Sequence, residues 1–344
     1  MPEKVLVRKL WDRIFALPKR EVVDLVAQLV EHNTFNVGAL GSSPSGITKR
    51  LSKKDSLFFF LTFWSTFVLH NIKSYMSSFF KDKVVVVTGG TDGIGKALVD
   101  ALLASGAKVA TCGRNSDKLY SLQTEYPSSP LHTMVADVSS ENDCRRFIEV
   151  TIKVFGGIDV LINNAGVSMR ALIKEAEVDV IRKVMDINFY GTVYCTKYAL
   201  QSIIERKGVI VGVSSIAGYR GLPGRSGYSA SKFAVQGWLE AIKTELVADG
   251  VHVMWVCPGF TTSNIRNAAL NKEGSSHGET PMDESKMMTA EECAVHILKA
   301  VRKRKRTLVL TFTGKRTVFM QKFFPKLADN LVRKFFFKDG NLVK

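Results

Sequence analysis

Hydrophobic positions between residues 80 and 312 alternate regularly between short apolar runs and longer amphipathic segments. The first run, VVVVTG at 84–89, is continuous and β-branched, which is typical of a strand buried on both faces of a parallel sheet. Similar runs follow at 107–113, 131–137, 159–164, 208–215, 251–257 and 307–312, with amphipathic segments between them, among them 94–104, 142–155, 178–205 and 229–248. Seven strands joined by helices predict an α/β fold with a doubly wound, Rossmann-type parallel sheet. Residues 76–312 contain no repeat or linker, so we expect one domain there.

The first predicted strand runs into a glycine-rich turn that opens directly into a helix. The turn reads Thr88-Gly89-Gly90-Thr91-Asp92-Gly93-Ile94-Gly95, with the spacing G-x-x-x-G-x-G. Glycines allow a tight turn and let the backbone approach a pyrophosphate at the positive end of the helix. Taken alone, the turn fits either a nucleotide site or a strand-to-helix connection that needs glycine.

Further motifs follow the other strands in a fixed order, and together they resemble the short-chain dehydrogenase/reductase family over residues 80–312. The motifs are Asn163-Asn164-Ala165-Gly166, Asn188 within MDIN, Ser214-Ser215, Tyr228-Ser229-Ala230-Ser231-Lys232, and Pro258-Gly259. Within the family, the chain is similar to the dehydrogenase/reductase member 7 group and to 3-ketosphinganine reductases.

The chemistry of Tyr228 and Lys232 can be argued from their spacing. A phenol titrates near 10 and is a poor base at neutral pH. Lys232 lies one helical turn after Tyr228, and its positive charge is expected to lower the pKa of the phenol. The resemblance implies that Tyr228 is the acid/base, that Lys232 also holds the nicotinamide ribose, and that Ser215 binds the substrate oxygen. The resemblance also implies that Asn188 holds a water molecule in the proton relay.

The end of the second predicted strand indicates the cofactor. An acid there would bind a ribose 2′-hydroxyl, whereas an arginine accommodates a 2′-phosphate. The sequence has Arg114 and no acid before Asp117, which favours NADP(H), although Asp92 stands where many NADP enzymes carry a basic residue. The residues expected to bind the cofactor are Gly89, Thr91, Gly93, Ile94, Gly95, Arg114, Asp137, Val138, Asn164, Ala165, Gly166, Tyr228, Lys232, Pro258, Gly259, Thr261 and Ser263.

Composition and charge restrict the other classes of function. The chain of 344 residues is 46% hydrophobic, which excludes a disordered protein. Its five cysteines are scattered without C-x-x-C spacing, so we expect no metal site and a reducing compartment. The net charge of +16 belongs to the ends, because residues 76–299 hold 24 basic and 24 acidic residues. A neutral body offers no basic groove for nucleic acid.

Residues 1–75 match no recognisable domain, and two interpretations stay open. Residues 26–48 can be back-translated into the D-arm and T-arm of a transfer RNA in the right order. This predicts a reading frame extended upstream through a transfer RNA gene, with a natural start at Met76. Alternatively, the uncharged segment 56–72 is a single-pass membrane anchor, although its 17 residues stand at the lower limit of about 17 for a spanning helix and include polar ones.

The long connection 260–290 is expected to form the substrate lid. Its apolar residues and those near the catalytic serine predict a largely apolar pocket that suits a lipid, steroid-like or other hydrophobic ketone. The residues expected to line it are Met169, Leu172, Tyr219, Leu222, Pro223, Ile265, Ala268, Ala269, Leu270, Met287 and Met288.

The last segment, 313–344, is basic, and its stretch 318–338 predicts an amphipathic helix that either meets a membrane surface or packs on the body. The leading functional hypothesis is an NADP(H)-dependent ketone reductase in the cytoplasm, at a membrane surface. One alternative is a 3-oxoacyl thioester reductase of fatty-acid synthesis, and another is an NADP-sensing protein without turnover. The family resemblance implies a homodimer or homotetramer.

Overall fold

The computed structural model describes residues 79–276, 278 and 287–343, and all of them belong to one compact unit, Ser65–Lys344. Residues 1–75, including the candidate anchor at 56–72, lie outside the described residues. Among the residues that are described, no helix is both long and apolar enough to span a bilayer.

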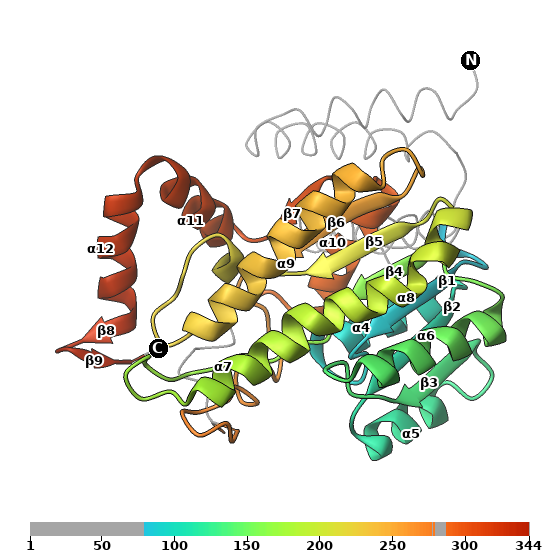
Figure 1. Cartoon of the computed structure of the whole chain (residues 1–344), viewed down its shortest axis with the longest axis horizontal. Helices are drawn as coiled ribbons and strands as arrows, with labels where there is room; N and C mark the ends of the chain where they lie inside the picture. The colour runs from blue at the N-terminus through green and yellow to red at the C-terminus, as the bar shows by residue number, and fades with distance from the viewer. Residues whose placement is uncertain (1–78, 277, 279–286, 344) are drawn as a thin grey trace, which may run out of the picture. The chain divides into compact units, whose positions relative to one another are not determined.

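Seven parallel strands form the central sheet, as the apolar runs predict (Figure 1). Their order is β3-β2-β1-β4-β5-β6-β7, so the direction of winding reverses between β1 and β4. A cofactor crevice is expected outside the carboxyl ends of the strands at such a switch point. The strands are β1 (Val84–Thr88), β2 (Lys108–Gly113), β3 (Leu131–Val135), β4 (Val160–Asn163), β5 (Val209–Val213), β6 (His252–Cys257) and β7 (Thr307–Val309).

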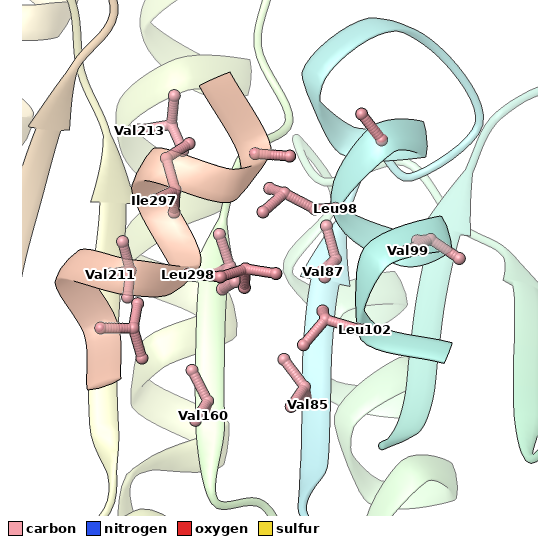
Figure 2. Packing of buried hydrophobic residues seen from close by; sticks show 14 of the residues in the cluster. Val85, Val87, Leu98, Val99, Leu102, Val160, Val211, Val213, Ile297 and Leu298 are labelled. Carbon is pink, nitrogen blue, oxygen red and sulfur yellow. The ribbon is translucent and has the colours of Figure 1, made fainter. Parts of the chain in front are cut away.

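Helices cover both faces of the sheet. One face carries α4 (Gly93–Leu103), α5 (Ser116–Glu125) and α10 (Ala290–Arg302), and the other carries α6 (Glu141–Phe155), α8 (Gly191–Glu205) and α9 (Ser226–Glu245). The continuous run of β1 serves both layers, because successive side chains of a strand point to opposite faces. Val85 and Val87 pack beneath α4 and α10 (Figure 2). Val86 joins the cluster on the other face.

Local signals in the sequence define where the helices begin and end. Ser140 caps α6 by accepting a hydrogen bond from the Asp143 amide, and Gly156 ends that helix with a φ of 78°. Thr289 and Glu292 form a reciprocal capping box at the start of α10.

The segment predicted as one long helix at 178–205 is interrupted. It consists of α7 (Val178–Met185), a π-helical turn η2 (Asp186–Tyr190) and α8. Such turns within α-helices occur frequently at functional sites. Here the turn contains Asn188.

The C-terminal segment also differs from the single amphipathic helix expected at 318–338. It forms α11 (Phe312–Phe323) and α12 (Pro325–Phe336), followed by a short hairpin of β8 (Phe337–Lys338) and β9 (Asn341–Leu342). Pro325 causes the break, because it cannot donate a backbone hydrogen bond and disfavours helical geometry in the preceding residue. Arg220 ties the segment to the body through Asp329, at 2.6 Å, and through Gln321, at 2.8 Å.

Candidate active site

The glycine-rich turn connects β1 to α4 at the switch point of the sheet. Gly89 and Gly93 have φ angles of 69° and 50°, values that a residue with a side chain adopts only with strain. A side chain at Gly95 would collide with the carbonyl oxygen of Gly89. The turn therefore needs glycine at these positions, where a side chain would be strained or would press against neighbouring residues of the site.

Side chains from two strands hold the turn in place. The amide of Asn164, which follows β4, donates to the carbonyl oxygens of Thr88 and Gly89 at 3.0 and 3.2 Å. The Thr88 hydroxyl in turn accepts from the backbone N–H groups of Asn164 and Ala165, each at 3.0 Å. These hydrogen bonds thus join the motif after β1 to the motif after β4 at the carboxyl edge of the sheet.

The N-terminus of α4 is free of side-chain capping. Asp92 occupies the cap position, but its carboxylate makes no capping hydrogen bond and instead pairs with Lys118 at 2.7 Å. The first turn also carries no acid. The N–H groups and the positive end of the helix dipole are consequently available to an anion such as a pyrophosphate.

Lys118 is a cavity residue that the sequence reasoning missed. It lies on α5 and lines the same cavity as Arg114 and Asn115 at the end of β2. Asn115 caps α5 by accepting from the Lys118 N–H at 2.8 Å, which sets the start of the helix. The pairing of Lys118 with Asp92 joins residues 26 positions apart, so only the fold could reveal it.

The candidate catalytic side chains meet where β5 ends and α9 begins. Ser215 follows β5 and caps the short 3-10 turn η3 (Ile216–Gly218) by accepting from the Ala217 N–H at 3.1 Å. Tyr228 and Lys232 lie one turn apart on α9, with the ammonium 5.8 Å from the centre of the phenol ring. The neighbouring Ser214 is bonded within the structure, accepting from Gln236 at 2.7 Å.

Burial dominates the electrostatics of Tyr228. It raises the pKa of the phenol above 10, while a hydrogen bond with Ser215 and the charge of Arg225 act in the opposite direction. This differs from the sequence-based expectation that Lys232 lowers the pKa of Tyr228. The phenol therefore remains protonated at neutral pH, which suits donation of a proton to a carbonyl oxygen.

Burial has the opposite effect on Lys232, whose pKa falls from 10.5 to about 8. Its ammonium donates to the carbonyl oxygen of Val213 at 2.8 Å. At pH 7 the side chain therefore still carries its charge inside the site.

Asn188 lies behind the cavity. Its side chain accepts from the Val167 N–H at 2.8 Å and donates to the Val167 carbonyl oxygen and the Ser231 hydroxyl, each at 2.9 Å. A side chain at Gly166 would lie 3.0 Å from the Asn188 amide oxygen and 3.4 Å from the Lys232 ammonium. Asn188 thus holds the loop after β4 next to Lys232.

A cavity of about 760 Å³ brings the other predicted site residues together. Ser215 and the whole set expected to bind the cofactor line this cavity, whereas Asn188 does not. Ser263 lies against the glycine-rich turn, because a Cβ at Gly93 would meet its Cβ at 3.0 Å. No three His, Cys, Asp or Glu side chains of the described residues are grouped as metal ligands.

The predicted substrate wall was correct only in part. Leu222, Ile265 and Ala268 line the cavity. Met169 and Leu270 do not line the cavity but are buried in the hydrophobic cluster that also contains Tyr228. Tyr219 packs against the core and accepts a hydrogen bond from the Trp255 indole at 3.1 Å. Leu172, Pro223, Ala269, Met287 and Met288 are also outside the cavity lining.

Helices α11 and α12 supply apolar wall that the sequence did not reveal. The residues concerned are Met320, Ala328, Leu331, Val332, Phe335 and Phe336. They occupy one face of the C-terminal helices and close the cavity opposite Ile216 and Phe260. The lining of the whole cavity also contains Arg225, Arg266 and Arg316, so the cavity is not uniformly apolar.

The chain belongs to the short-chain dehydrogenase/reductase family. The family model described as short chain dehydrogenase matches residues 83–274. The mouse (Mus musculus) protein called Dehydrogenase/reductase SDR family member 7B is 34% identical over 303 residues, covering 86% of this chain and 93% of its own length. Residues 76–344 make up less than 86% of the chain, so this match must extend to residues before Met76. The zebrafish (Danio rerio) protein of the same name is 35% identical over 260 residues, covering 72% and 83%.

Solved structures share the fold. A short-chain dehydrogenase/reductase from Burkholderia phymatum, in complex with NAD, superimposes with a TM-score of 0.65 at 21% identity, covering 72% of this chain and 95% of that one. A short-chain dehydrogenase from Streptomyces avermitilis gives the same TM-score at 25% identity, covering 74% and 96%. Members of this family use nicotinamide cofactors, so this chain is an oxidoreductase of that class.

Proposed function

We propose that this chain is an NADP(H)-dependent oxidoreductase that interconverts a ketone and a secondary alcohol on a hydrophobic, lipid- or steroid-like substrate. The observation that carries the proposal is a single cavity containing Ser215, Tyr228 and Lys232 beside the glycine-rich turn. The glycine-rich turn that lines the cavity and the uncapped start of α4 fit a dinucleotide. When bound, the nicotinamide supplies or accepts the hydride.

The residues of the site then handle the substrate oxygen. In reduction, the Ser215 hydroxyl holds the carbonyl oxygen, and the protonated phenol of Tyr228 donates its proton as that oxygen gains negative charge. The charges of Arg225 and Lys232 stabilise the phenolate that results. In oxidation the same phenolate accepts the proton of the alcohol.

Two cations at the end of β2 support NADP(H) over NAD(H). Arg114 and Lys118 line the cavity, and the strand is followed by Arg114 and Asn115, neither of which is an acid. A 2′-phosphate would bring negative charge to this corner, where it suits two cations better than a ribose hydroxyl does. Asp92 offsets part of this preference because it already pairs with Lys118.

Replacing Arg114 with Asp is expected to shift the preference from NADPH towards NADH. Charge-assisted hydrogen bonds contribute about 1.5–3 kcal/mol, so affinity for 2′,5′-ADP should fall about 10- to 100-fold. Calorimetric titration of the full chain with 2′,5′-ADP and with 5′-AMP measures this effect. Affinity for 5′-AMP serves as the control and should stay within about threefold. Equal losses for both nucleotides would show that the 2′-phosphate is bound elsewhere.

The C-terminal wall supports a substrate with a sizeable apolar part. Met320, Val332 and Phe336 extend the cavity beyond the catalytic residues. The positive charges of Arg225 and Arg266 favour a second candidate, the 3-oxoacyl thioester, whose carrier bears phosphates.

A panel of carbonyl compounds tests the reaction and separates these candidates. The full chain is incubated with NADPH and either long-chain ketones, steroid-like ketones or 3-oxoacyl thioesters, and oxidation of NADPH is followed by absorbance. Turnover of the free ketones is expected. Turnover of the thioesters alone would select the second candidate. Tight NADPH binding without turnover of any compound would contradict the enzymatic proposal and favour a sensing protein.

A further inference from the structure

Helix α11 has two different faces. The residues of α11 that line the cavity are Thr313, Gly314, Arg316, Thr317 and Met320. The opposite face presents Phe312, Phe319 and Phe323, which are 81%, 54% and 56% exposed. These exposed aromatic side chains distinguish α11 from a surface helix that buries its apolar residues in a single stripe against the core.

The exposed aromatic side chains gather where α11 turns into α12. The ring of Phe319 lies 4.8 Å from that of Phe323 and 6.2 Å from that of Phe324, which is 51% exposed. We call Phe319, Phe323 and Phe324 the outer aromatic surface. Contiguous exposed apolar groups of this kind mark contacts with partners or membranes.

Basic residues surround this surface. Lys315 and Lys322 lie on α11, and Lys326 begins α12, all of them exposed. The Lys322 ammonium lies 5.5 Å from the centre of the Phe323 ring. Of the two acids between 312 and 343, Asp329 is paired with Arg220. Exposed aromatic groups with basic residues nearby suit the interface of an anionic bilayer, which has an apolar interior and a negatively charged surface.

We propose that the outer aromatic surface docks on an anionic lipid bilayer, with Phe319, Phe323 and Phe324 entering its interfacial region. The opposite faces of the same helices line the catalytic cavity, so docking would bring the substrate wall to the lipid surface. This inference rests on the proposed function for its substrate class, but the docking itself is independent of turnover.

A tryptophan placed on the surface reports contact with lipid locally. In the full chain, Phe323→Trp is expected to show additional fluorescence quenching by vesicles of brominated phosphatidylcholine containing phosphatidylserine. The matched control is Val247→Trp, at a position 68% exposed after α9 and away from the C-terminal helices. It should show no added quenching over the natural tryptophans. Because both proteins carry the same N-terminal segment, a difference in quenching between them reports which of the two positions lies at the lipid, rather than a difference in binding through that segment.

A second set of experiments varies the charge of the vesicles and the aromatic content of the outer aromatic surface. Quenching of Phe323→Trp should fall several-fold in vesicles without phosphatidylserine and at high salt, where the Debye length shortens. In separate vesicle titrations, Phe319→Ser/Phe323→Ser should weaken the phosphatidylserine-dependent part of binding by about tenfold or more. Equal quenching of the two tryptophan variants would overturn the docking. Loss of a dimer in sedimentation of the double serine variant would also overturn it, by assigning the surface to a second copy.

Turnover of a water-soluble ketone without vesicles separates this inference from the proposed function. Phe323 does not line the cavity, so Phe323→Trp should retain the turnover of the unmodified chain. Unchanged turnover with no added quenching would reject the docking alone. Absence of turnover in the unmodified chain would instead reject the proposed function.

Discussion

Replacing Tyr228 with Phe is expected to lower kcat by about 10²- to 10⁴-fold, the range that a positioned proton donor contributes. The substitution removes only the hydroxyl, which is buried in the cavity next to Ser215. The aromatic ring and its packing stay in place, so the affinity for NADPH should change by less than about threefold. Steady-state kinetics with a substrate found in the ketone panel, together with NADPH titration, measure both quantities.

Tyr219→Phe is the matched control for this experiment. Tyr219 also carries a half-buried hydroxyl, but that hydroxyl bonds to the Trp255 indole and does not line the cavity. Its loss is expected to leave kcat almost unchanged. Similar losses in both variants would mean that removing a phenol hydroxyl disturbs the fold, and undiminished turnover in Tyr228→Phe would refute its role as acid.

Replacing Lys232 with Met is expected to lower kcat/KM for reduction by about 10²-fold or more, because the developing phenolate loses a buried positive charge. The pKa of Lys232 is about 8, so the lysine is charged below that pH and neutral above it. For the unmodified chain, kcat/KM should therefore fall as pH rises through about 8. The variant should lack this basic limb. Rates measured from pH 6 to 9.5 at saturating NADPH provide the comparison.

Thermal unfolding without cofactor gives an independent readout for the same variant. The pKa of Lys232 in the folded chain lies below its ordinary value of 10.5, so burying its charge costs stability below pH 8, and this cost is relieved as the pH rises towards 10.5. Lys232→Met should therefore raise Tm at pH 7. The control Lys243→Met, on the same helix but outside the cavity, should change neither the pH profile nor kcat. A basic limb retained in Lys232→Met would assign that limb to another group.

The strands were predictable because each carries its own signal. Four consecutive β-branched residues at 84–87 are typical of a strand that is buried on both faces. Because a helix lies between each pair of such strands, a parallel sheet covered by helices is the arrangement that buries the strands. The motifs after the strands were predictable for a related reason. In a parallel sheet all carboxyl ends lie at one edge, so residues far apart, such as Gly89 and Ser215, meet there.

Other features depend on contacts between distant segments. The π-helical turn that aims Asn188 at Val167 has no local pattern, because the same residues fit an uninterrupted α-helix. Met169 and Leu270 are apolar residues near the site, and only their packing shows that they stabilise the fold rather than line the cavity. Hydrophobic character indicates burial but does not select the surface against which a side chain is buried.

By itself, the sequence predicted the seven-stranded sheet and the glycine-rich turn, because strand periodicity and glycine stereochemistry act over a few residues. The candidate catalytic side chains were predicted from motifs whose order and spacing resemble the short-chain dehydrogenase/reductase family. The tertiary structure alone decided the pairing of Asp92 with Lys118 and the place of the C-terminal helices. The amphipathic pattern at 318–338 indicates only that one face of the helix is apolar and is expected to lie in an apolar environment. Pro325 and the link from Arg220 to Asp329 orient the two helices so that one side closes the cavity and the other remains exposed. Their orientation depends on contacts made across more than a hundred residues of chain, which no local pattern encodes.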